Sequence, residues 1–467
     1  MFLELDRHNP DSVAVIDADG NIVTYGQLCQ DIKDSSNFLV NRAIVFLLCE
    51  NSVGAIYAYL SCIENKCIPL ILSSKIDEKL LSELIATYKP AYIWSSSAYG
   101  LISDDNCLIT KYGYKLIRTE YSIYPVYEDL ALLLSTSGST GSPKLVRHNY
   151  KNLISSAKNV AKFFDLKNND RPLIDLPMFY TMGHSVVISH LYAGATLLMI
   201  SKSMLDKSFW DFFVKNEATS FTGVPYSYQI LKRLGFTSKR WPSLKLLTQG
   251  GGKLSNQLYK EFSDYAYENN IKFIPTFGQT ECTARMAYLS DDLSREKIGS
   301  IGNAIPEGRF FLVDDSGKEI VENDIEGELG YAGPNVALGY AEKMDDLSKG
   351  DEWKGSILTG DIAIRDSDDC YYIVGRKKRF LKLFGCRVSL DRCEKLIKDE
   401  FNLECVCMGN DEKMLIYVED FCLDNEIPKF LSKKMGMVIT AFKVIHLESF
   451  PRNEYGKIKY IDLQVKE

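Results

Sequence analysis

The sequence predicts an α/β fold, with a large N-terminal domain of layered α/β sheets and a small, mobile C-terminal α+β domain. Short uninterrupted apolar runs alternate with segments whose apolar residues recur every three or four positions. This alternation is typical of buried parallel strands joined by crossover helices. In addition, a chain of 467 residues is too long for one ordinary hydrophobic core, which suggests two or three domains.

Each element of the large domain follows from its local pattern. Crossover helices are expected where the apolar spacing has the helical period, at residues 150–164 and 209–216. Strands buried on both faces are expected where the apolar runs lie, at residues 43–48, 130–134, 195–200, 244–247 and 271–274.

The C-terminal part of the chain has a different pattern. It contains a hairpin-like segment at 371–385, an amphipathic helix at 389–401, and expected strands near 404–409 and 414–420. One helix with a continuous apolar face is enough to cover a small sheet. The predicted domains are residues 1–376 and residues 377–467.

Composition and charge restrict the possible functions. The chain is 46% hydrophobic and 25% charged, with a net charge of -7, which leaves no broad basic surface for nucleic acid or an anionic membrane. No apolar stretch approaches the roughly 18 residues of a membrane span, and the N-terminal sequence does not have the pattern of a secretory leader. The 12 cysteines show no disulfide-like or zinc-ligand spacing. We therefore expect a cytoplasmic enzyme with reduced thiols that acts on small molecules.

Several of the expected strands end in small or polar residues. The segments STSGSTGS, TQGGGKL and TFGQTE each follow an apolar run, and ligands of open α/β sheets bind beyond the carboxyl ends of strands. In the first segment, glycines can turn backbone N–H groups toward a phosphate, and Lys144 adds positive charge. A flexible turn is the alternative. A P-loop is disfavoured, because Pro143 and Leu145 replace its second glycine and its hydroxyl residue.

The loop at 135–145 closely resembles the signature [ST]SG[ST]TGxPKG of the adenylate-forming superfamily, with Leu145 in place of the last glycine. That superfamily contains acyl-coenzyme A synthetases, AMP-dependent ligases and stand-alone adenylation domains. Any single match is weak, but a set in the family's order is specific, and the chain is identified as a member. The other matches are TYGQL (24–28), PMFYTMGHS (177–185), TGVPYSYQIL (222–231), QGGGKL (249–254), FGQTE (277–281), GELGYAGPNVALGY (327–340), TGD (359–361), GRKKRFLKLFGCRVSLDRCE (375–394) and PRNEYGK (451–457).

The resemblance implies a reaction in two steps. ATP converts a carboxylic acid to an acyl-adenylate with release of pyrophosphate, and a pantetheine thiol then displaces AMP. Because two anions must meet at the α-phosphate, the site needs preorganised positive charge. Lys457 is expected to bridge the carboxylate and the α-phosphate, Thr280 to contact that phosphate, and Glu281 to hold Mg²⁺. The expected catalytic residues are Lys457, Thr280, Glu281 and Lys144.

Other matched positions are expected to bind ATP. Phe277 would stack on adenine, and Asp361 would accept both ribose hydroxyls with Arg376 as an added donor. The glycine-rich loop would let its backbone approach the base closely. The expected nucleotide-binding residues are Thr136, Ser137, Gly138, Ser139, Thr140, Gly141, Gly250, Gly251, Gly252, Phe277, Gly278, Gln279, Asp361 and Arg376.

The resemblance also places a hinge at Lys378, in the charged segment GRKKR. The small domain is expected to swing about this residue between the two steps. Lys457 would then leave the site, and the segment around Gly385 would line a channel for the thiol.

The wall of the acid pocket is expected to mix aromatic and small residues, which suits a modest acyl or aryl acid. The segment at 177–185 has no carboxylate, whereas amino-acid-activating relatives place an aspartate there, so a stand-alone amino-acid adenylating enzyme that charges a carrier protein is kept as the alternative. No proton transfer is assigned to His148 or His184. The expected wall residues are Tyr180, His184, Gly223, Val224 and Pro225, with Met182, Thr222 and 273–276 as further candidates.

The thiol acceptor is left open between coenzyme A and phosphopantetheine on a separate acyl carrier protein. Other classes remain distinguishable by assay. A phosphotransferase would produce ADP, and a luciferase-type relative would need oxygen and emit light. A catalytically silent nucleotide-binding relative would be expected to lack Lys457, Glu281 or Asp361, and all are present.

Overall fold

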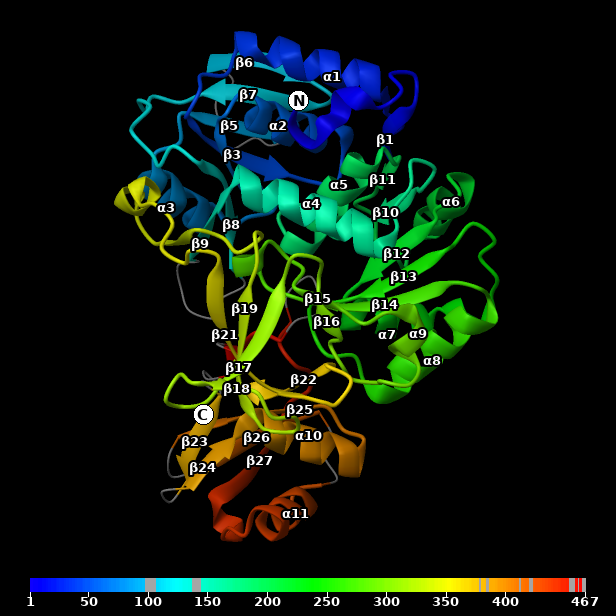
Figure 1. Cartoon of the computed structure of the whole chain (residues 1–467), viewed down its shortest axis with the longest axis vertical. Helices are drawn as coiled ribbons and strands as arrows, with labels where there is room; N and C mark the ends of the chain where they lie inside the picture. Colours follow the sequence, from blue (N-terminus) through cyan, green and yellow to red (C-terminus); the bar gives the residue numbers. More distant parts are fainter. Residues whose placement is uncertain are drawn as a thin grey trace. The chain divides into compact units, whose positions relative to one another are not determined.

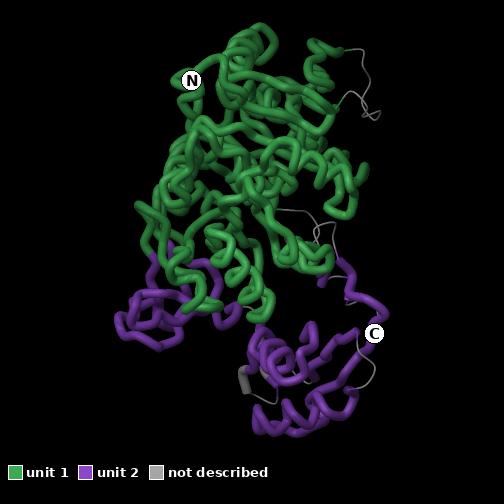
Figure 2. Tube along the Cα trace, turned by 90° about the vertical axis from the view of Figure 1, so that its right-hand side faces the viewer, with its two compact units in different colours: residues 1–309, 332–357 green, residues 310–331, 358–467 purple. Residues whose placement is uncertain are grey.

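A computed structural model of the chain describes residues 1–96, 106–136, 144–377, 379–383, 386–410, 413–419, 423–452, 458–460 and 462–463. The chain divides into two compact units (Figure 2). The first unit contains residues 1–309 and 332–357, and the second contains residues 310–331 and 358–467. The domain boundary expected at 376–377 stays a prediction, and the expected hinge residue Lys378 lies outside the described residues.

Two large sheets form the framework of the first unit (Figure 1). In the described part of the chain, one sheet has nine strands, in the order β16 (Asn303–Ala304), β15 (Ala287–Tyr288), β14 (Lys272–Phe277), β13 (Leu246–Gln249), β12 (Ser220–Gly223), β10 (Pro172–Ile174), β11 (Leu197–Met199), β1 (Val13–Asp17) and β2 (Ile22–Thr24). The other has eight, in the order β20 (Gly339–Ala341), β9 (Leu145–Asn149), β8 (Leu130–Ser135), β4 (Ile68–Ser73), β3 (Ile44–Cys49), β5 (Tyr92–Ser96), β7 (Tyr114–Arg118) and β6 (Cys107–Lys111). The central strands of both sheets run parallel, as the continuous apolar runs predict.

Helices pack between the two sheets. Leu47 of β3 and Leu197 of β11 belong to one buried core, to which the helices contribute Leu60, Leu153 and Val187. Helix α4 covers the residues expected from the sequence, because Asn149 caps its first turn by accepting a hydrogen bond from Asn152 N at 2.8 Å. These inner helices are α2 (Val53–Glu64), α4 (Tyr150–Phe164) and α5 (Thr181–Ala193).

The opposite faces of the sheets have their own helical cover. Phe46 of β3 points away from Leu47 and packs with Leu81 of α3 (Glu78–Tyr88), as the two-residue period of a strand requires. On the nine-stranded sheet, α6 (Lys207–Lys215), α7 (Pro225–Arg233) and α8 (Asn256–Glu268) belong to another core, to which α6 and α8 contribute Phe213 and Phe262. The first unit also contains α1 (Tyr25–Asp34) and α9 (Asp291–Ser294).

The second unit contains a five-stranded sheet and smaller sheets near the C-terminus. The five strands follow the order β18 (Glu319–Ile320), β17 (Arg309–Val313), β19 (Gly327–Ala332), β21 (Ser356–Arg365) and β22 (Tyr371–Arg376). The smaller sheets are β23 (Phe380–Leu383) with β24 (Cys386–Ser389), and β25 (Cys405–Gly409) with β26 (Met414–Val418) and β27 (Phe442–His446). Helices α10 (Leu390–Phe401) and α11 (Glu426–Met435) bury Ile397 and Leu431 against these strands. The predicted α/β fold class, with a small α+β part, is confirmed.

The expected hairpin at 371–385 is wrong. Strand β22 pairs antiparallel with β21, and the hairpin is formed by β23 and β24 instead. The alternating pattern of β22 identifies a strand, but its partner is an earlier, longer strand that local periodicity does not reveal. The ten cysteines whose side chains the structure describes are free thiols. None of the helices described here has the length and apolar character that crossing a bilayer requires.

Candidate active site

Parallel pairing aligns the ends of three strands of the nine-stranded sheet. Gly223 at the end of β12 lies opposite Gln249 of β13, which lies opposite Pro275 of β14. Beyond the strands, Gly250 N donates a hydrogen bond to Gly223 O at 3.1 Å. The glycine-rich loop and the segment at 222–225 are therefore neighbours at the carboxyl edge of the sheet, where open α/β sheets bind ligands.

Gly250 lies where a side chain would not fit. A Cβ at this position would be 2.8 Å from Met182 Sδ and 2.9 Å from Thr276 Oγ1. Neighbouring Gly251 and Gly252 would meet Val224 and Pro225, each at 3.2 Å. This close packing brings the expected adenine loop, helix α5 and two walls of the expected acid pocket together.

The start of helix α5 lies next to the FGQTE segment. The hydroxyl oxygens of Thr181 and Thr280 are 2.8 Å apart. Thr181 is the first residue of the helix, after Tyr180 at its N-cap, so the positive end of the helix dipole faces Thr280. This arrangement favours an anion near Thr280.

Glu281 is held by a tyrosine to which the sequence analysis gave no role. Tyr340 of β20 donates its hydroxyl to Glu281 Oε1 at 2.6 Å. Burial, followed by the charge of Glu281, raises the pKa of Tyr340, which keeps the hydroxyl protonated as a donor. Lys144 Nζ lies 5.5 Å from the centroid of the same ring. A cation and a carboxylate therefore meet at one aromatic side chain.

Lys144 forms an exposed ion pair with a glutamate. Its Nζ is 2.7 Å from Glu342 Oε1, and the two side chains are 53% and 61% exposed. Exposed pairs of this kind contribute only about 0–1 kcal/mol, so Lys144 can exchange Glu342 for a phosphate at small cost. Thr136 N donates a hydrogen bond to Lys144 O at 3.0 Å. This bond joins the two described residues that flank the signature loop. The loop residues Ser137, Gly138, Ser139, Thr140 and Gly141 lie outside the described residues.

The chain folds back sharply after Phe277, which is half-buried at the end of β14. A Cβ on Gly278 would lie 1.5 Å from Ala284 O, so only glycine fits. Thr283 and Ala284 adopt positive φ angles of 51° and 77°, which cost energy in residues with side chains and often occur at functional sites. The intervening Gln279 is the N-cap of a short 3₁₀ helix, η5 (Thr280–Cys282).

Hydrogen bonds hold this strained turn in place. Thr283 Oγ1 donates to Asn335 O at 2.8 Å and lies 3.2 Å from His148 Nδ1. Ser156 of α4 donates to Thr283 O at 3.0 Å. The turn directs the next residue, Arg285, into the protein.

Arg285 is a buried cation that the sequence analysis missed. Its side chain is 2% exposed, Nη1 donates to Thr276 Oγ1 at 3.2 Å, and its guanidinium lies 4.8 Å from the ring centroid of Phe164. Burial lowers the pKa of Arg285 to about 9. A charged residue in the otherwise apolar stretch ARMAYL was the signal that could have identified it.

The two histidines near this site are buried and neutral. His184 Nε2 lies 2.8 Å from the hydroxyl of Tyr59, and burial lowers the pKa of both His184 and His148 to about 3. Neither group is therefore expected to take up a proton near neutral pH. A place for His184 in the pocket wall stays a prediction.

The two expected ribose-binding residues lie together in the second unit. Asp361 on β21 is opposite Arg376 on β22, and Arg376 Nε lies 2.9 Å from Asp361 Oδ1. Asp361 is 3% exposed, whereas the side chain of Arg376 is 64% exposed. A buried carboxylate with an exposed cationic partner can accept hydrogen bonds from a diol. The expected catalytic Lys457 lies outside the described residues, as does Gly385.

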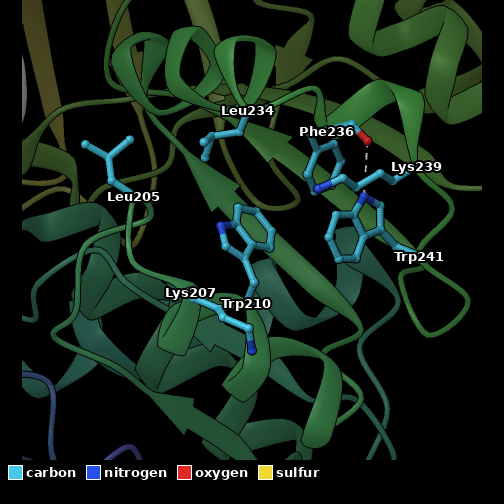
Figure 3. Close-up of a pocket in the computed structure, with 7 residues that line it drawn as sticks. All are labelled: Leu205, Lys207, Trp210, Leu234, Phe236, Lys239 and Trp241. Carbon is cyan, nitrogen blue, oxygen red and sulfur yellow. Dashed lines mark hydrogen bonds between the residues drawn. The ribbon is translucent and has the colours of Figure 1, made fainter.

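A cavity of about 190 Å³ lies elsewhere in the first unit (Figure 3). The rings of Trp210 and Trp241 are 5.1 Å apart, and Trp241 Nε1 donates to Phe236 O at 3.2 Å. Its wall contains none of the expected site residues, and its only charged groups are two lysines. The lining residues are Leu205, Lys207, Trp210, Leu234, Phe236, Lys239 and Trp241.

Comparison with known proteins identifies the family. The family model described as AMP-binding enzyme matches residues 4–341. The chain belongs to the AMP-binding enzyme family. The family membership expected from the signature segments is thereby confirmed.

Curated relatives in this family include several coenzyme A ligases. Oxalate–CoA ligase from Arabidopsis thaliana is 30% identical over 352 residues, which cover 71% of this chain and 66% of the relative. Acetyl-coenzyme A synthetase 1 from Debaryomyces hansenii is 27% identical, with coverage of 71% and 53%. 2-Succinylbenzoate–CoA ligase from Bacillus cereus is 26% identical, with coverage of 73% and 70%. The match therefore spans just under two thirds and about half of the first two relatives.

Solved structures of the family share the fold. An o-succinylbenzoate coenzyme A synthetase from Bacillus subtilis in complex with AMP superposes with a TM-score of 0.80 at 21% identity, covering 100% of this chain and 97% of that one. ATP-bound MatB from Rhodopseudomonas palustris gives a TM-score of 0.79 at 20% identity, with coverage of 100% and 99%.

Proposed function

We propose that this chain is an AMP-forming acid–coenzyme A ligase. It joins a small carboxylic acid to AMP with release of pyrophosphate, and then transfers the acyl group to the thiol of coenzyme A. The observation that carries this proposal is the arrangement of Glu281, Tyr340 and Lys144 in a chain of the AMP-binding enzyme family. The similar proteins named above are coenzyme A ligases for oxalate, acetate and 2-succinylbenzoate.

The residues of the first unit fit a triphosphate. Lys144 would exchange Glu342 for a phosphate oxygen, and Thr280 would offer its hydroxyl beside the α5 N-terminus. Glu281 would hold Mg²⁺, since a carboxylate oxygen is a suitable ligand for a hard cation, and the hydrogen bond from Tyr340 fixes its orientation. Mg²⁺ would neutralise phosphate charge during attack by the acid.

Other roles follow from the matched motifs. Asp361 and Arg376 would bind the ribose, Phe277 would stack on adenine, and the signature loop at 136–141 would cradle the phosphates. Lys457 would bridge the attacking carboxylate and the α-phosphate, and the part of the chain beyond the Lys378 hinge would move before thiol transfer. A carrier-bound phosphopantetheine is an acceptor to test beside coenzyme A.

The test is acid-dependent exchange of labelled pyrophosphate into ATP over a panel of carboxylic acids. We expect exchange with at least one acid, and loss of most of it in Lys457→Ala, whereas thiolysis of a supplied acyl-adenylate should survive. Lys459→Ala changes a nearby exposed lysine and serves as the matched control, with activity near that of the unmodified protein.

Product analysis completes the experiment. Release of AMP and pyrophosphate supports the proposal, whereas ADP and orthophosphate would exclude it. Equal loss of exchange and thiolysis in Lys457→Ala would contradict the role given to that lysine. Parallel assays with coenzyme A and with carrier-bound phosphopantetheine identify the acceptor.

A further inference from the structure

We infer that the acid substrate is a dicarboxylic acid and that Arg285 binds its second carboxylate. This inference rests on the proposed function and specifies the substrate class of the same site. It depends on a buried cation, its unused donors and its position beside the strand ends.

The position of Arg285 links it to the pocket wall. Its Nη1 donates to Thr276 Oγ1, and a Cβ on Gly250 would approach both that oxygen and Met182 Sδ to less than 3 Å. Thr276, Gly250 and Met182 thus converge where β13, β14 and α5 meet, and the guanidinium reaches this group through its hydrogen bond to Thr276. An acid whose reacting carboxylate lies near Thr280 would extend its other end into this region.

Several N–H groups of Arg285 have no hydrogen-bond acceptor among the described residues. In the described part of the chain, Nε and Nη2 are buried without a hydrogen-bond partner, and Arg285 forms no ion pair with a carboxylate. The contacts to Thr276 and to the face of Phe164 use one donor and the π surface. A guanidinium presents its donors as a planar fork that matches a carboxylate with two parallel hydrogen bonds.

A buried cation without a counter-ion destabilises the protein that carries it. Such groups usually have a function, because a structural role would be served better by a paired or apolar residue. The burial that lowers the pKa of Arg285 also makes an incoming carboxylate interact strongly, since the surroundings contain little water.

The backbone supports the same conclusion. Two consecutive residues with positive φ, Thr283 and Ala284, precede Arg285, and bonds from Ser156 and to Asn335 hold the turn. Asn335 Nδ2 also donates to Arg285 O at 3.0 Å. These hydrogen bonds hold the turn in its strained conformation, and that conformation directs the Arg285 side chain into the protein.

The experiment compares each dicarboxylic acid with its own monomethyl ester in the pyrophosphate-exchange assay. Oxalate, malonate, succinate and 2-succinylbenzoate cover increasing lengths, and each ester keeps one carboxylate but loses one charge. We expect at least one diacid to exceed its ester by at least about 30-fold in kcat/KM, because an unpaired buried charge is the consequence of losing the second carboxylate.

Arg285→Met should remove this preference by raising the KM for the diacid, and it should not lower kcat/KM for the ester, which no longer meets an unpaired buried charge. Arg285→Lys should retain part of it, and Arg240→Met, which alters an exposed arginine, should match the unmodified protein. Arg285→Met should also raise the Tm of the ligand-free protein, since it removes a buried unpaired charge. A large fall in Tm would indicate a structural arginine and overturn the inference.

The outcomes separate the inference from the proposed function. Exchange supported by monocarboxylic acids, with diacids no better and Arg285→Met unaffected, would refute the inference and leave the ligase intact. If no acid supports exchange, the proposed function fails. Calorimetric titration of the diacids in the presence of ATP then tests whether Arg285 binds a carboxylate. Diacid binding that is lost in Arg285→Met would still support the carboxylate site at Arg285. Diacid binding that is equal in the two proteins, or absent from both, would refute it.

Discussion

Acidification should destabilise the first unit through three buried histidines. His148, His184 and His190 are at most 3% exposed, and burial lowers their pKa values to about 3, 3 and 4. In the unfolded chain each would titrate near its ordinary pKa of about 6.5. Because the folded pKa values are depressed, the stability that these groups confer is present above pH 6.5 and is lost as the pH falls.

The size of the effect follows from the number of protons taken up on unfolding. Each histidine contributes up to about 1.4 kcal/mol per pH unit, and because an unfolded histidine is only half protonated at pH 6.5, the three together contribute about 5 kcal/mol between pH 6.5 and 5. Asp175 acts in the opposite sense, since burial raises its pKa to about 7 and the folded form therefore binds a proton that the unfolded form releases. The net loss is then about 3 kcal/mol, which is a large fraction of a typical stability of about 5–15 kcal/mol.

Urea unfolding followed by tryptophan fluorescence measures this loss. All 4 tryptophans, Trp94, Trp210, Trp241 and Trp353, lie in the first unit, so their emission reports the unit that contains the histidines. We expect the free energy of unfolding to fall by about 2 kcal/mol per pH unit between pH 6.5 and 5, which corresponds to an average of about 1.5 protons.

Variants identify the groups responsible. His184→Gln removes one titrating group and should reduce this slope to about half, whereas Asp175→Asn should make it steeper by one proton. His446→Gln changes a histidine of the second unit and should leave the slope of the tryptophan signal unchanged. A free energy of unfolding that is constant between pH 6.5 and 5, or a His184→Gln slope equal to that of the unmodified protein, would refute the reasoning.

Two predictions concern the nucleotide and its metal ion. Tyr340→Phe removes the hydroxyl that donates a hydrogen bond to Glu281. It should raise the Mg²⁺ concentration for half-maximal exchange by about tenfold, which is the effect of losing one hydrogen bond to a charged group. An unchanged Mg²⁺ titration would contradict this role. Asp361→Ala should weaken ATP binding, measured by calorimetry, by about tenfold or more without unfolding the protein. The control Asp369→Ala, which changes an exposed aspartate, should leave ATP affinity unchanged. Unchanged ATP affinity in Asp361→Ala would remove Asp361 from the ribose site.

Local sequence patterns were sufficient to identify most strands and helices and the segments that resemble the family's binding loops. Helix α4 begins and ends at the predicted residues, because its apolar period and its Asn149 cap are local properties. The segments TQGGGKL and FGQTE could be placed at strand ends for the same reason. In the structure, the parallel neighbours β13 and β14 then bring these two segments together at the carboxyl edge of the sheet.

The choice of partners for individual strands and side chains depends on the folded structure. Three examples are the pairing of β22 with β21, the hydrogen bond from Tyr340 to Glu281, and the burial of Arg285 beside Thr276. In each case, the local sequence pattern around one partner does not identify the other. The physical reason is that local patterns fix backbone conformation, whereas the burial of a charge or the choice of a strand's partner depends on the packing of the whole fold.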